Sequence, residues 1–269
     1  MEENRSHGLI RRVRTLPVSA LNLLIFLYLL APLIVLIWTS FGSEAFPTFP
    51  PKAYSLRWYS SFLKNEQFMN SLFLSLHVAL WTTFLALLIG IPVSFALVRY
   101  RFGGSTLLNT LCMSPILFPG VVIGIALLVF YAKVRLSSSF AGLVCAHVIL
   151  AIPFVIRLVS ASLYGLGRSL EEASLNLGAS RLKTFFLITM PLIKPGIIAG
   201  GLFAFFTSFD EVTVTLFIAG SKFTTLPMRL YTFVEYSSDP TIAAISAFLI
   251  LMALCLGVPV GWRFLGIRK

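Results

Sequence analysis

Two adjacent carboxylates, Asp210 and Glu211, lie in the middle of a long apolar stretch of this sequence. An ionised carboxylate in lipid costs several kcal/mol unless it faces water, a cation or a partner group, so we expect both residues to have a function. Successive residues of a helix point about 100° apart, so the two carboxylates do not form a dyad on one face. We expect one to face an aqueous path, where it would bind a cation weakly, and the other to face a neighbouring helix or subunit. The alternative is a salt bridge or hydrogen bond that locks two helices together.

The other reactive side chains form no catalytic or metal-binding pattern. The sequence has no H-E-x-x-H motif, no serine with an obvious histidine partner and no G-x-x-x-x-G-K-[ST] loop, which argues against an intramembrane enzyme and against ATP hydrolysis by this chain. His77 and His147 lie on separate apolar segments, where structural histidines are expected more than a proton relay. The three cysteines have neither metal-ligand spacing nor an even count and are expected to be packing residues: Cys112, Cys145 and Cys255.

The composition indicates a membrane protein. Of the 269 residues 58% are apolar and 12% are charged, and the mean hydropathy is +0.92. These charges are too few to cover the surface of a soluble domain. The net charge of +11 does not indicate nucleic-acid binding, because the basic residues flank apolar runs and form no basic face.

An all-α fold is expected, since a lipid-exposed backbone must satisfy its own hydrogen bonds and no alternating strand pattern appears. Pro115, Pro119 and Gly120 are expected to loosen the third spanning helix near its middle, where they could line a path or simply pack as a kink. The sequence predicts six spanning helices: Leu16–Phe41, Phe68–Val98, Leu107–Ala132, Phe140–Leu158, Gly196–Ala219 and Thr241–Phe264.

The distribution of basic residues predicts the orientation. With the N-terminus inside the cell, 14 of the 21 lysines and arginines fall on the cytoplasmic side, so both termini are predicted to be cytoplasmic. A cleaved signal peptide would also begin with basic residues before an apolar run, but this run is too long and lacks a clear cleavage site. We therefore expect residues 1–66 to hold a cytoplasmic segment, the first helix and an outer loop, residues 67–264 the remaining helices, and residues 265–269 a cytoplasmic tail.

The largest outer loop, Gly42–Gln67, is expected to contain a short helix at the outer membrane interface. This loop is too small to form a ligand-binding domain. Capture of a dilute solute outside the membrane must therefore use another protein or the pocket between the helices. The apolar residues of the expected helix recur at helical spacing: Leu56, Trp58, Tyr59, Phe62 and Leu63.

The cytoplasmic loop between the fourth and fifth spans comprises residues 164–195. It is predicted to form a helix, a turn at Gly178 and a second helix from about Ser180. Ser169 and Glu172 have the spacing of a capping box at the start of the first helix. Such a helical pair with small exposed residues suits docking into a groove of another protein. An ordinary amphipathic surface loop, in which Glu172 only caps a helix, is the alternative.

This loop, residues 164–195, resembles the EAA signature of binding-protein-dependent ABC importer permeases, and we call it the EAA loop. The signature consists of Glu-Ala-Ala, three residues, Gly, nine residues and Ile-x-Leu-Pro. The matching residues here are Glu172-Ala173-Ser174, Gly178 and Ile188-Thr189-Met190-Pro191, with Ser174 and Met190 as mild departures. The resemblance implies the type I (MetI-like) permease fold and a role for Glu172, Ala173, Ser174 and Gly178 in coupling to a cytoplasmic ATPase.

The resemblance also implies the partners. These are a second permease, most simply in a heterodimer, two ATPase subunits, an extracytoplasmic solute-binding protein and the lipid bilayer of the bacterial inner membrane. ATP and magnesium would be bound by the ATPase, and no cofactor by this chain. A stand-alone secondary carrier is the alternative that the coupling signature argues against.

Further segments are similar to the spermidine/putrescine permease family, closest to its shorter, PotC-like permease. If the cargo is a polyamine cation, Asp210 and Glu211 become candidates for the translocation path, and Trp58 matches a family aromatic that could meet the solute or its binding protein or act as an interfacial anchor. Gly120, a further path candidate, stands where polyamine members carry an acidic residue. Opines, other amine-bearing solutes and phosphonates are alternative cargoes. The similar segments are Ala96–Phe102, Leu177–Ser180, Ser208–Val212 and Leu226-Pro227.

Overall fold

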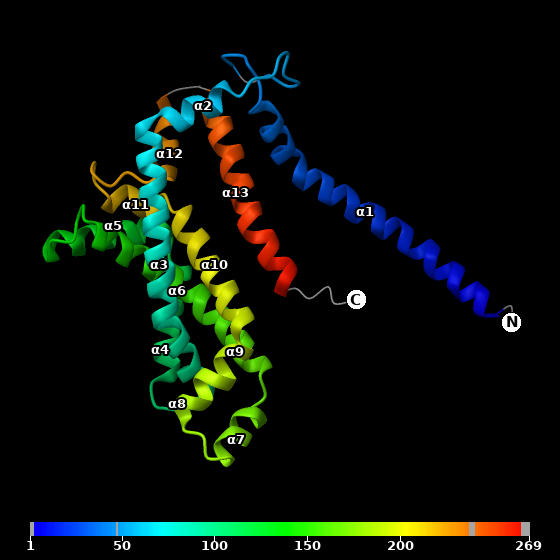
Figure 1. Ribbon diagram of the computed structural model, residues 1–269, viewed down its shortest axis with the longest axis vertical. Coiled ribbons are helices and arrows are strands. Elements are labelled where there is room, and N and C mark those ends of the chain that lie inside the picture. Colours follow the sequence, from blue (N-terminus) through cyan, green and yellow to red (C-terminus); the bar gives the residue numbers. More distant parts are fainter. Residues whose placement is uncertain (1–2, 47, 237–239, 265–269) are drawn as a thin grey trace. The chain divides into compact units, whose positions relative to one another are not determined.

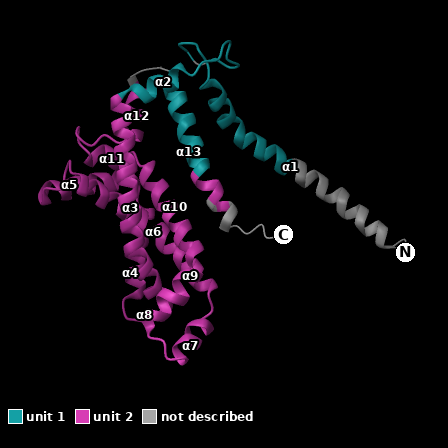
Figure 2. Cartoon of the chain, viewed as in Figure 1, with its two compact units in different colours: residues 1–65, 237–255 teal, residues 66–236, 256–269 magenta. Residues whose placement is uncertain are grey.

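The computed structural model describes residues 3–46, 48–236 and 240–264, and all its named elements are helices. The chain divides into two compact units, coloured separately in Figure 2: residues 1–65 with 237–255, and residues 66–236 with 256–269. Unit 1 contains α1 (Glu3–Thr39), α2 (Arg57–Lys64) and most of α13 (Thr241–Phe264).

The loop between α1 and α2 is held by aromatic and hydroxyl side chains. The Trp38 indole Nε1–H donates to the Tyr54 hydroxyl at 2.9 Å, and the hydroxyls of Ser40 and Tyr59 are 2.6 Å apart. The Phe62 ring, fully buried, lies 5.6 Å from the ring of Phe248 on α13. The short helix predicted in this loop is therefore confirmed, at Arg57–Lys64.

Unit 2 carries the remaining helices, which Figure 1 labels. They are α3 (Glu66–Arg99), α4 (Ser105–Leu117), α5 (Gly120–Val134), α6 (Phe140–Gly165), α7 (Ser169–Asn176), α8 (Arg181–Thr184), the π-helical turn η1 (Phe185–Thr189), α9 (Met190–Leu192), α10 (Lys194–Phe209), α11 (Thr213–Ile218) and α12 (Leu226–Tyr236).

Helices α3, α6 and α10 pack together and form the centre of unit 2. The buried face of α3 carries small residues at helical spacing, among them Ala79, Ala86 and Gly90, which let neighbouring backbones approach closely. A side-chain carbon at Gly90 would lie only 2.6 Å from Cγ1 of Val155 on α6, and one at Gly200 on α10 would lie 3.3 Å from the Cα of Val155. The packing of these three helices therefore depends on the absence of larger side chains.

Four of the predicted spans are observed as single helices, the third is bent, and the fifth is interrupted between α10 and α11. Four single helices are long and apolar enough to cross a membrane, within α1, α3, α6 and α13, and the count reaches six if each of two bent pairs is one span. The pair α4 and α5 is bent by 109°, and the segment from α8 to α9 makes 71° with α10. Helix α6 also continues past the predicted end at Leu158, to Gly165.

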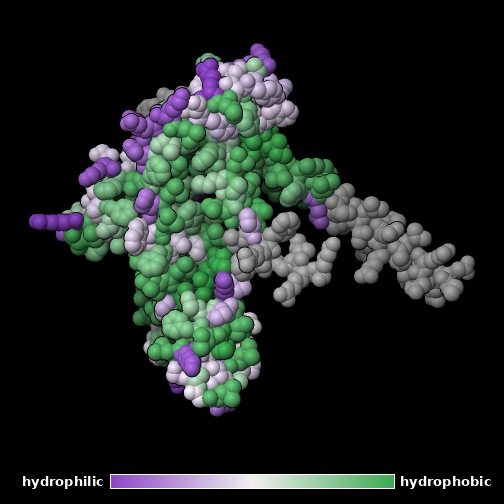
Figure 3. Space-filling model, in the orientation of Figure 1, coloured by the Kyte–Doolittle hydropathy of each residue, from purple (hydrophilic) through white to green (hydrophobic). Residues whose placement is uncertain are grey.

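The surface of unit 2 agrees with a membrane environment. Apolar side chains cover most of the helical surface seen in Figure 3, whereas hydrophilic ones lie mainly towards its ends. On α3 the exposed residues include Leu80, Trp81, Phe84 and Leu88. Exposed apolar side chains in such numbers indicate contact with lipid or with another apolar protein surface.

Candidate functional site

The EAA loop has the predicted helix, turn and helix. Gly178 has a φ of +85°, the left-handed conformation that glycine adopts without steric cost, and its N–H donates to the carbonyl of Leu175 at 2.9 Å. Ser180 then caps the second helix, because its Oγ accepts a hydrogen bond from the N–H of Lys183. The side chains of Ser174 and Thr184 are hydrogen-bonded at 3.0 Å and so join the two helices.

The predicted capping box between Ser169 and Glu172 is wrong. Arg168 occupies the N-cap position of α7, Ser169 is already the first helical residue, and no side chain caps this end. The helix begins one residue earlier than the motif requires, so the Ser169 hydroxyl is not placed to bond the orphan amides. Glu172 is exposed, and no hydrogen bond or ion pair is recorded for its side chain in the described residues.

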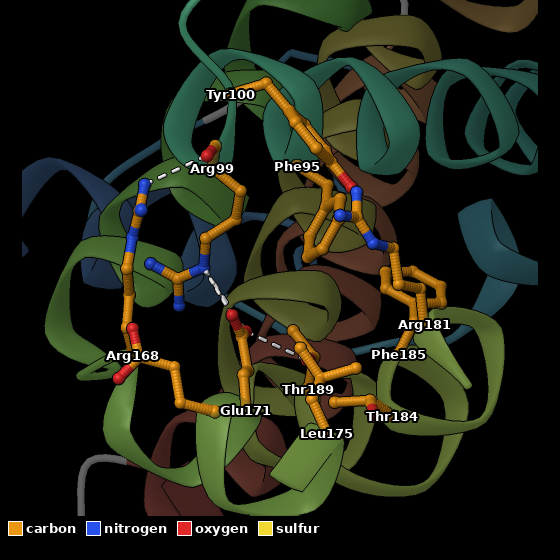
Figure 4. A pocket seen from close by; sticks show the side chains of 11 residues that line it. Phe95, Arg99, Tyr100, Arg168, Glu171, Leu175, Arg181, Thr184, Phe185 and Thr189 are labelled. Carbon is orange, nitrogen blue, oxygen red and sulfur yellow. Dashed lines mark hydrogen bonds and ion pairs between the residues drawn. The ribbon is translucent and has the colours of Figure 1, made fainter. Parts of the chain in front are cut away.

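Glu171, which the sequence interpretation passed over, anchors the loop to the end of α3. Its carboxylate pairs with Arg99 at 3.0 Å and accepts a hydrogen bond from the Thr189 hydroxyl at 2.9 Å (Figure 4). Arg99 also donates to the carbonyl of Leu166, and Arg168 donates to the carbonyl of Arg99, both at 2.9 Å. The Arg99 and Glu171 side chains are 9% and 13% exposed, so water screens this ion pair little.

A cavity of about 230 Å³ lies behind α7, between the loop and the end of α3. Its polar lining consists mainly of charged groups, and Figure 4 shows Arg99, Arg168 and Arg181 around it with Glu171. The two glutamates of the loop therefore face different surroundings. Glu171 is bonded within the chain, whereas Glu172 at the edge of the cavity is exposed.

The EAA loop exposes several large apolar side chains among charged ones such as Arg181 and Lys183. Leu177 is 89% exposed and Leu182 is 72% exposed, and Leu170, Leu175 and Phe186 are also exposed. Because the neighbouring Glu172 and Ala173 are exposed as well, the matched motif and this apolar patch lie on the loop's accessible side. An apolar patch of this kind next to an unpaired carboxylate is suited to contact with another protein.

The second candidate region is a break between α10 and α11. The sequence predicted one helix over Gly196–Ala219, but α10 ends at Phe209 and α11 begins at Thr213, so Asp210 and Glu211 lie between two helices and not within one. Glu211 explains part of the break, because its carboxylate accepts a hydrogen bond from the N–H of Val214 at 2.7 Å and so caps the start of α11. Asp210 is exposed, with no hydrogen bond or ion pair recorded for its carboxylate among the described residues.

A second break lies beside the first. The chain turns between α4 and α5 at Phe118 and Pro119, so the span is interrupted near its middle as predicted, at Pro119 and Gly120, whereas Pro115 lies within α4. Gly120, the first residue of α5, is so close to Thr213 that a side-chain carbon there would lie 3.2 Å from its Cγ2. One turn further on, a side-chain carbon at Gly124 would lie 2.5 Å from the Phe217 ring. Helices α5 and α11 therefore lie against each other, and the path candidates Gly120, Asp210 and Glu211 are gathered in one place.

The sequence matches a known family of transport proteins over most of its length. Residues 83–263 match the family described as binding-protein-dependent transport system inner membrane component. The chain belongs to this family of permeases. It is 34% identical over 235 residues to the putrescine transport system permease protein PotI of Escherichia coli K12, over 85% of this chain and 83% of that protein. It is 31% identical to the spermidine/putrescine permease PotC of the same strain, over 86% of this chain and 87% of that protein.

The solved structures confirm the fold of the permease. A bacterial ABC transporter involved in the import of the acidic polysaccharide alginate matches with a TM-score of 0.76 and 17% identity, over 95% of this chain and 97% of that chain. An alginate ABC transporter has also been solved in complex with its pentasaccharide-bound periplasmic protein, and its chain matches with a TM-score of 0.67 over 94% of this chain and 96% of that one. The permease is thus an all-α, multi-span transport component of the ABC importer type, with the MetI-like fold that the sequence predicted.

Trp58 of the permease belongs to unit 1, whereas Gly120, Asp210 and Glu211 belong to unit 2. The Arg57 guanidinium carbon lies 4.1 Å from the centroid of the Trp58 ring, and the buried Trp58 Nε1–H has no hydrogen-bond partner among the described residues. Within unit 2 the permease has the groups for two tasks. The EAA loop has an exposed surface with apolar side chains suited to protein contact, and the two helix breaks offer an exposed carboxylate in an otherwise apolar region.

Proposed function

We propose that this permease forms half of the translocation path of an ATP-driven importer for a small organic cation such as spermidine or putrescine. Its partners would be a second, different permease, two ATPase subunits that bind ATP and magnesium, and an extracytoplasmic solute-binding protein. The complex would lie in the bacterial inner membrane, with both termini of this chain in the cytoplasm. Membership of the permease family and the basic residues near the EAA loop support this arrangement.

The exposed face of the EAA loop is the observation that carries the coupling half of the proposal. Glu172 and Ala173 are presented to the outside, and Ser174 and Gly178 fix the shape of the loop from within. We assign this surface to the cleft of the ATPase subunit. The ion pair between Glu171 and Arg99 then joins the docked loop to the end of α3. Movement of the ATPase would be passed to α3 and its neighbours as a rigid-body motion.

The carboxylate of Asp210 carries the cargo half of the proposal. It is exposed at the break between α10 and α11, next to the break that begins α5. An unpaired carboxylate in this setting attracts a cation, and one such group gives the weak binding that transport requires. PotI and PotC are named for putrescine and spermidine, which are cations. Glu211 supports the site by capping α11, and Gly120 lets the start of α5 approach Thr213 of α11 closely.

Transport would proceed by alternating access. ATP binding closes the ATPase dimer, the EAA loops of both permeases move with it, and the path opens toward the loaded binding protein. Hydrolysis then returns the path to the cytoplasmic side. Asp210 would meet the cation only briefly, and the binding protein would set most of the specificity. We assign Trp58, on α2 of unit 1, a contact with the binding protein or the solute.

Reconstitution tests the proposal. The complete complex in proteoliposomes, with binding protein and ATP, should accumulate labelled spermidine or putrescine, and omission of either ATP or the ATPase should stop uptake. Uptake by the permeases without the ATPase would contradict the proposal and favour a secondary carrier. The cargo is tested separately by measuring which solute the cognate binding protein retains. An opine, another amine or a phosphonate there would overturn the polyamine assignment and leave the importer assignment intact.

A further inference from the structure

His147 on α6 is buried at the point where α10 and α11 separate. Its ring is 1% exposed, and both ring nitrogens have hydroxyl partners. Nδ1 lies 2.8 Å from the Ser208 hydroxyl, near the end of α10, and Nε2 lies 3.0 Å from the Thr215 hydroxyl, in α11. Ser208 and Thr215 are themselves buried. One side chain of a third helix therefore bridges the two helices on either side of Asp210 and Glu211.

The hydrogen bonds around His147 fit one arrangement of protons. The Thr215 hydroxyl donates its single proton to the carbonyl of Glu211 at 3.1 Å, so it must accept from Nε2 of His147. A neutral imidazole, which is favoured because neither ring partner is charged, then has a bare Nδ1 that accepts from the Ser208 hydroxyl. The chain of donors runs from Ser208 through His147 and Thr215 to the backbone of Glu211. All of these polar groups are satisfied without water.

The hydrogen bonds of His147 lie in apolar surroundings and help to fix the conformation of the segment between α10 and α11. Its sequence neighbours Ala146 and Val148 belong to the apolar cluster that also contains Val214 and Ile218 of α11. Between Phe209 and Thr213 the helical backbone bonding is only partial: the Asp210 N–H still donates to the carbonyl of Phe206 and the Val212 carbonyl accepts from Leu216, while the chain changes from one helix to the next. The bridge at His147 and the cap at Glu211 add side-chain contacts to these backbone bonds and so help to hold the segment.

We propose that His147 is a positioning residue of the translocation path, which fixes the break between α10 and α11 and so sets where Asp210 is presented. The role in transport rests on the proposed function of Asp210, whereas the hold on the break does not. His77 provides the contrast. It is exposed on α3, and its Nδ1 contacts only the carbonyl of Phe73 in its own helix.

Nuclear magnetic resonance of the assembled complex tests the bridge directly. With ¹⁵N-histidine in this permease, the signal that disappears in His147→Gln should show a protonated Nε2 and an unprotonated Nδ1. Thr215→Val should shift that Nε2 signal, because its acceptor is lost. A ring protonated at Nδ1, or a signal that does not respond to Thr215→Val, would overturn the proposal.

Chemical labelling tests whether the bridge holds the break. In a complex whose Cys112, Cys145 and Cys255 are replaced by serine, a cysteine at Val212 should react with a water-soluble maleimide several-fold faster when His147→Leu is added. His147→Gln keeps an amide donor near the position of Nε2 and His147→Asn keeps an acceptor near that of Nδ1, so each should give an intermediate rate. His77→Leu is the control and should leave the rate unchanged. Equal rates for His147→Leu and the parent would contradict the proposal.

Uptake tests the link to Asp210 with a double-mutant cycle. His147→Leu should lower cation uptake about tenfold while the complex assembles and hydrolyses ATP as before. Adding His147→Leu to Asp210→Asn should cause little further loss, because the position of a neutral side chain at 210 matters less. Additive losses would overturn the action through Asp210. If Asp210→Asn alone transports normally, the proposed function fails, and the resonance and labelling results still decide whether His147 holds the break.

Discussion

The EAA loop and the break between α10 and α11 each contain two adjacent acidic residues, and in each pair the two carboxylates have different surroundings. Glu171 is bonded to Arg99 and Thr189, and Glu211 to the N–H of Val214. Glu172 and Asp210 are exposed and have no recorded hydrogen bond or ion pair in the described part of the chain. One carboxylate of each pair thus maintains the local fold, and the other is available to a second molecule.

The two regions differ in what surrounds the available carboxylate. Around Glu172 the loop exposes apolar side chains such as Leu177 and Leu182, as expected of a surface that another protein covers. Around Asp210 the neighbouring polar groups are satisfied within the chain, through His147, Ser208 and Thr215. A small cargo needs a preformed site of this kind, because it cannot cover exposed apolar surface.

Charge reversal at Glu172 should have the largest effect. Glu172→Lys leaves every recorded contact in the loop intact but reverses the charge on the docking surface, which can cost several kcal/mol when like charges then meet. Uptake should fall to background, and the ATPase should no longer copurify with the permease. Glu235→Lys, at an exposed position on α12, is the matched control and should assemble normally. A Glu172→Lys complex with normal assembly and coupled hydrolysis would refute the docking assignment.

Neutralising Asp210 should have the next largest effect. Asp210→Asn keeps the shape of the side chain but removes the charge, so cation uptake should fall about tenfold or more, equivalent to at least ~1.4 kcal/mol of lost stabilisation. Hydrolysis stimulated by the binding protein should persist, because the coupling loop is untouched. Asp210→Glu, which keeps the charge, should retain more uptake than Asp210→Asn. Unchanged uptake in Asp210→Asn would assign this carboxylate to the fold, like Glu211.

Some of these features could be predicted from the sequence and others could not. The spans and the EAA loop were predictable because hydropathy and motif spacing are local properties of the chain. The breaks were harder. Pro119 signalled the first, but Phe209 to Thr213 is as apolar on both sides as a continuous helix, and a hydropathy average does not register whether the helical hydrogen bonds continue.

A division of roles was expected for Asp210 and Glu211, but which member of each acidic pair takes which role could not be predicted. Adjacent glutamates at 171 and 172 differ only in the direction in which the helix points them, and that direction depends on where Arg99 and Thr189 lie in the fold. The capping-box spacing even favoured the wrong residue, since Glu172 caps nothing. Likewise, no local pattern shows that Gly120 meets Thr213, because the contact joins segments more than ninety positions apart.

Removal of the Glu171 charge should have a smaller effect than that of Asp210, and a different one. Glu171→Gln loses the ion pair with Arg99, so the complex should be less stable by ~1.5–3 kcal/mol, the range for hydrogen bonds to charged groups. Its melting temperature should fall, and uptake should fall only a few-fold. Glu172→Gln should leave the melting temperature of the isolated permease unchanged. Arg99→Gln combined with Glu171→Gln should cost less than the sum of the two, because each single change already breaks the pair.

The smallest effect is expected for neutralising Glu211. This variant tests whether Glu211 has a structural role and Asp210 the role in binding the cation. The side-chain carbonyl in Glu211→Gln can still accept from the N–H of Val214, so α11 keeps its cap and uptake should stay within about twofold of the parent. Glu211→Ala removes the cap and should cost ~1 kcal/mol of stability, measured as a lower melting temperature. The two variants separate the charge of Glu211 from its capping bond, because Gln removes only the charge whereas Ala removes the charge and the bond. If Glu211→Gln reduced cation uptake as strongly as Asp210→Asn, charge at both positions would serve the cargo, and the division between a structural and an available carboxylate would fail in this region.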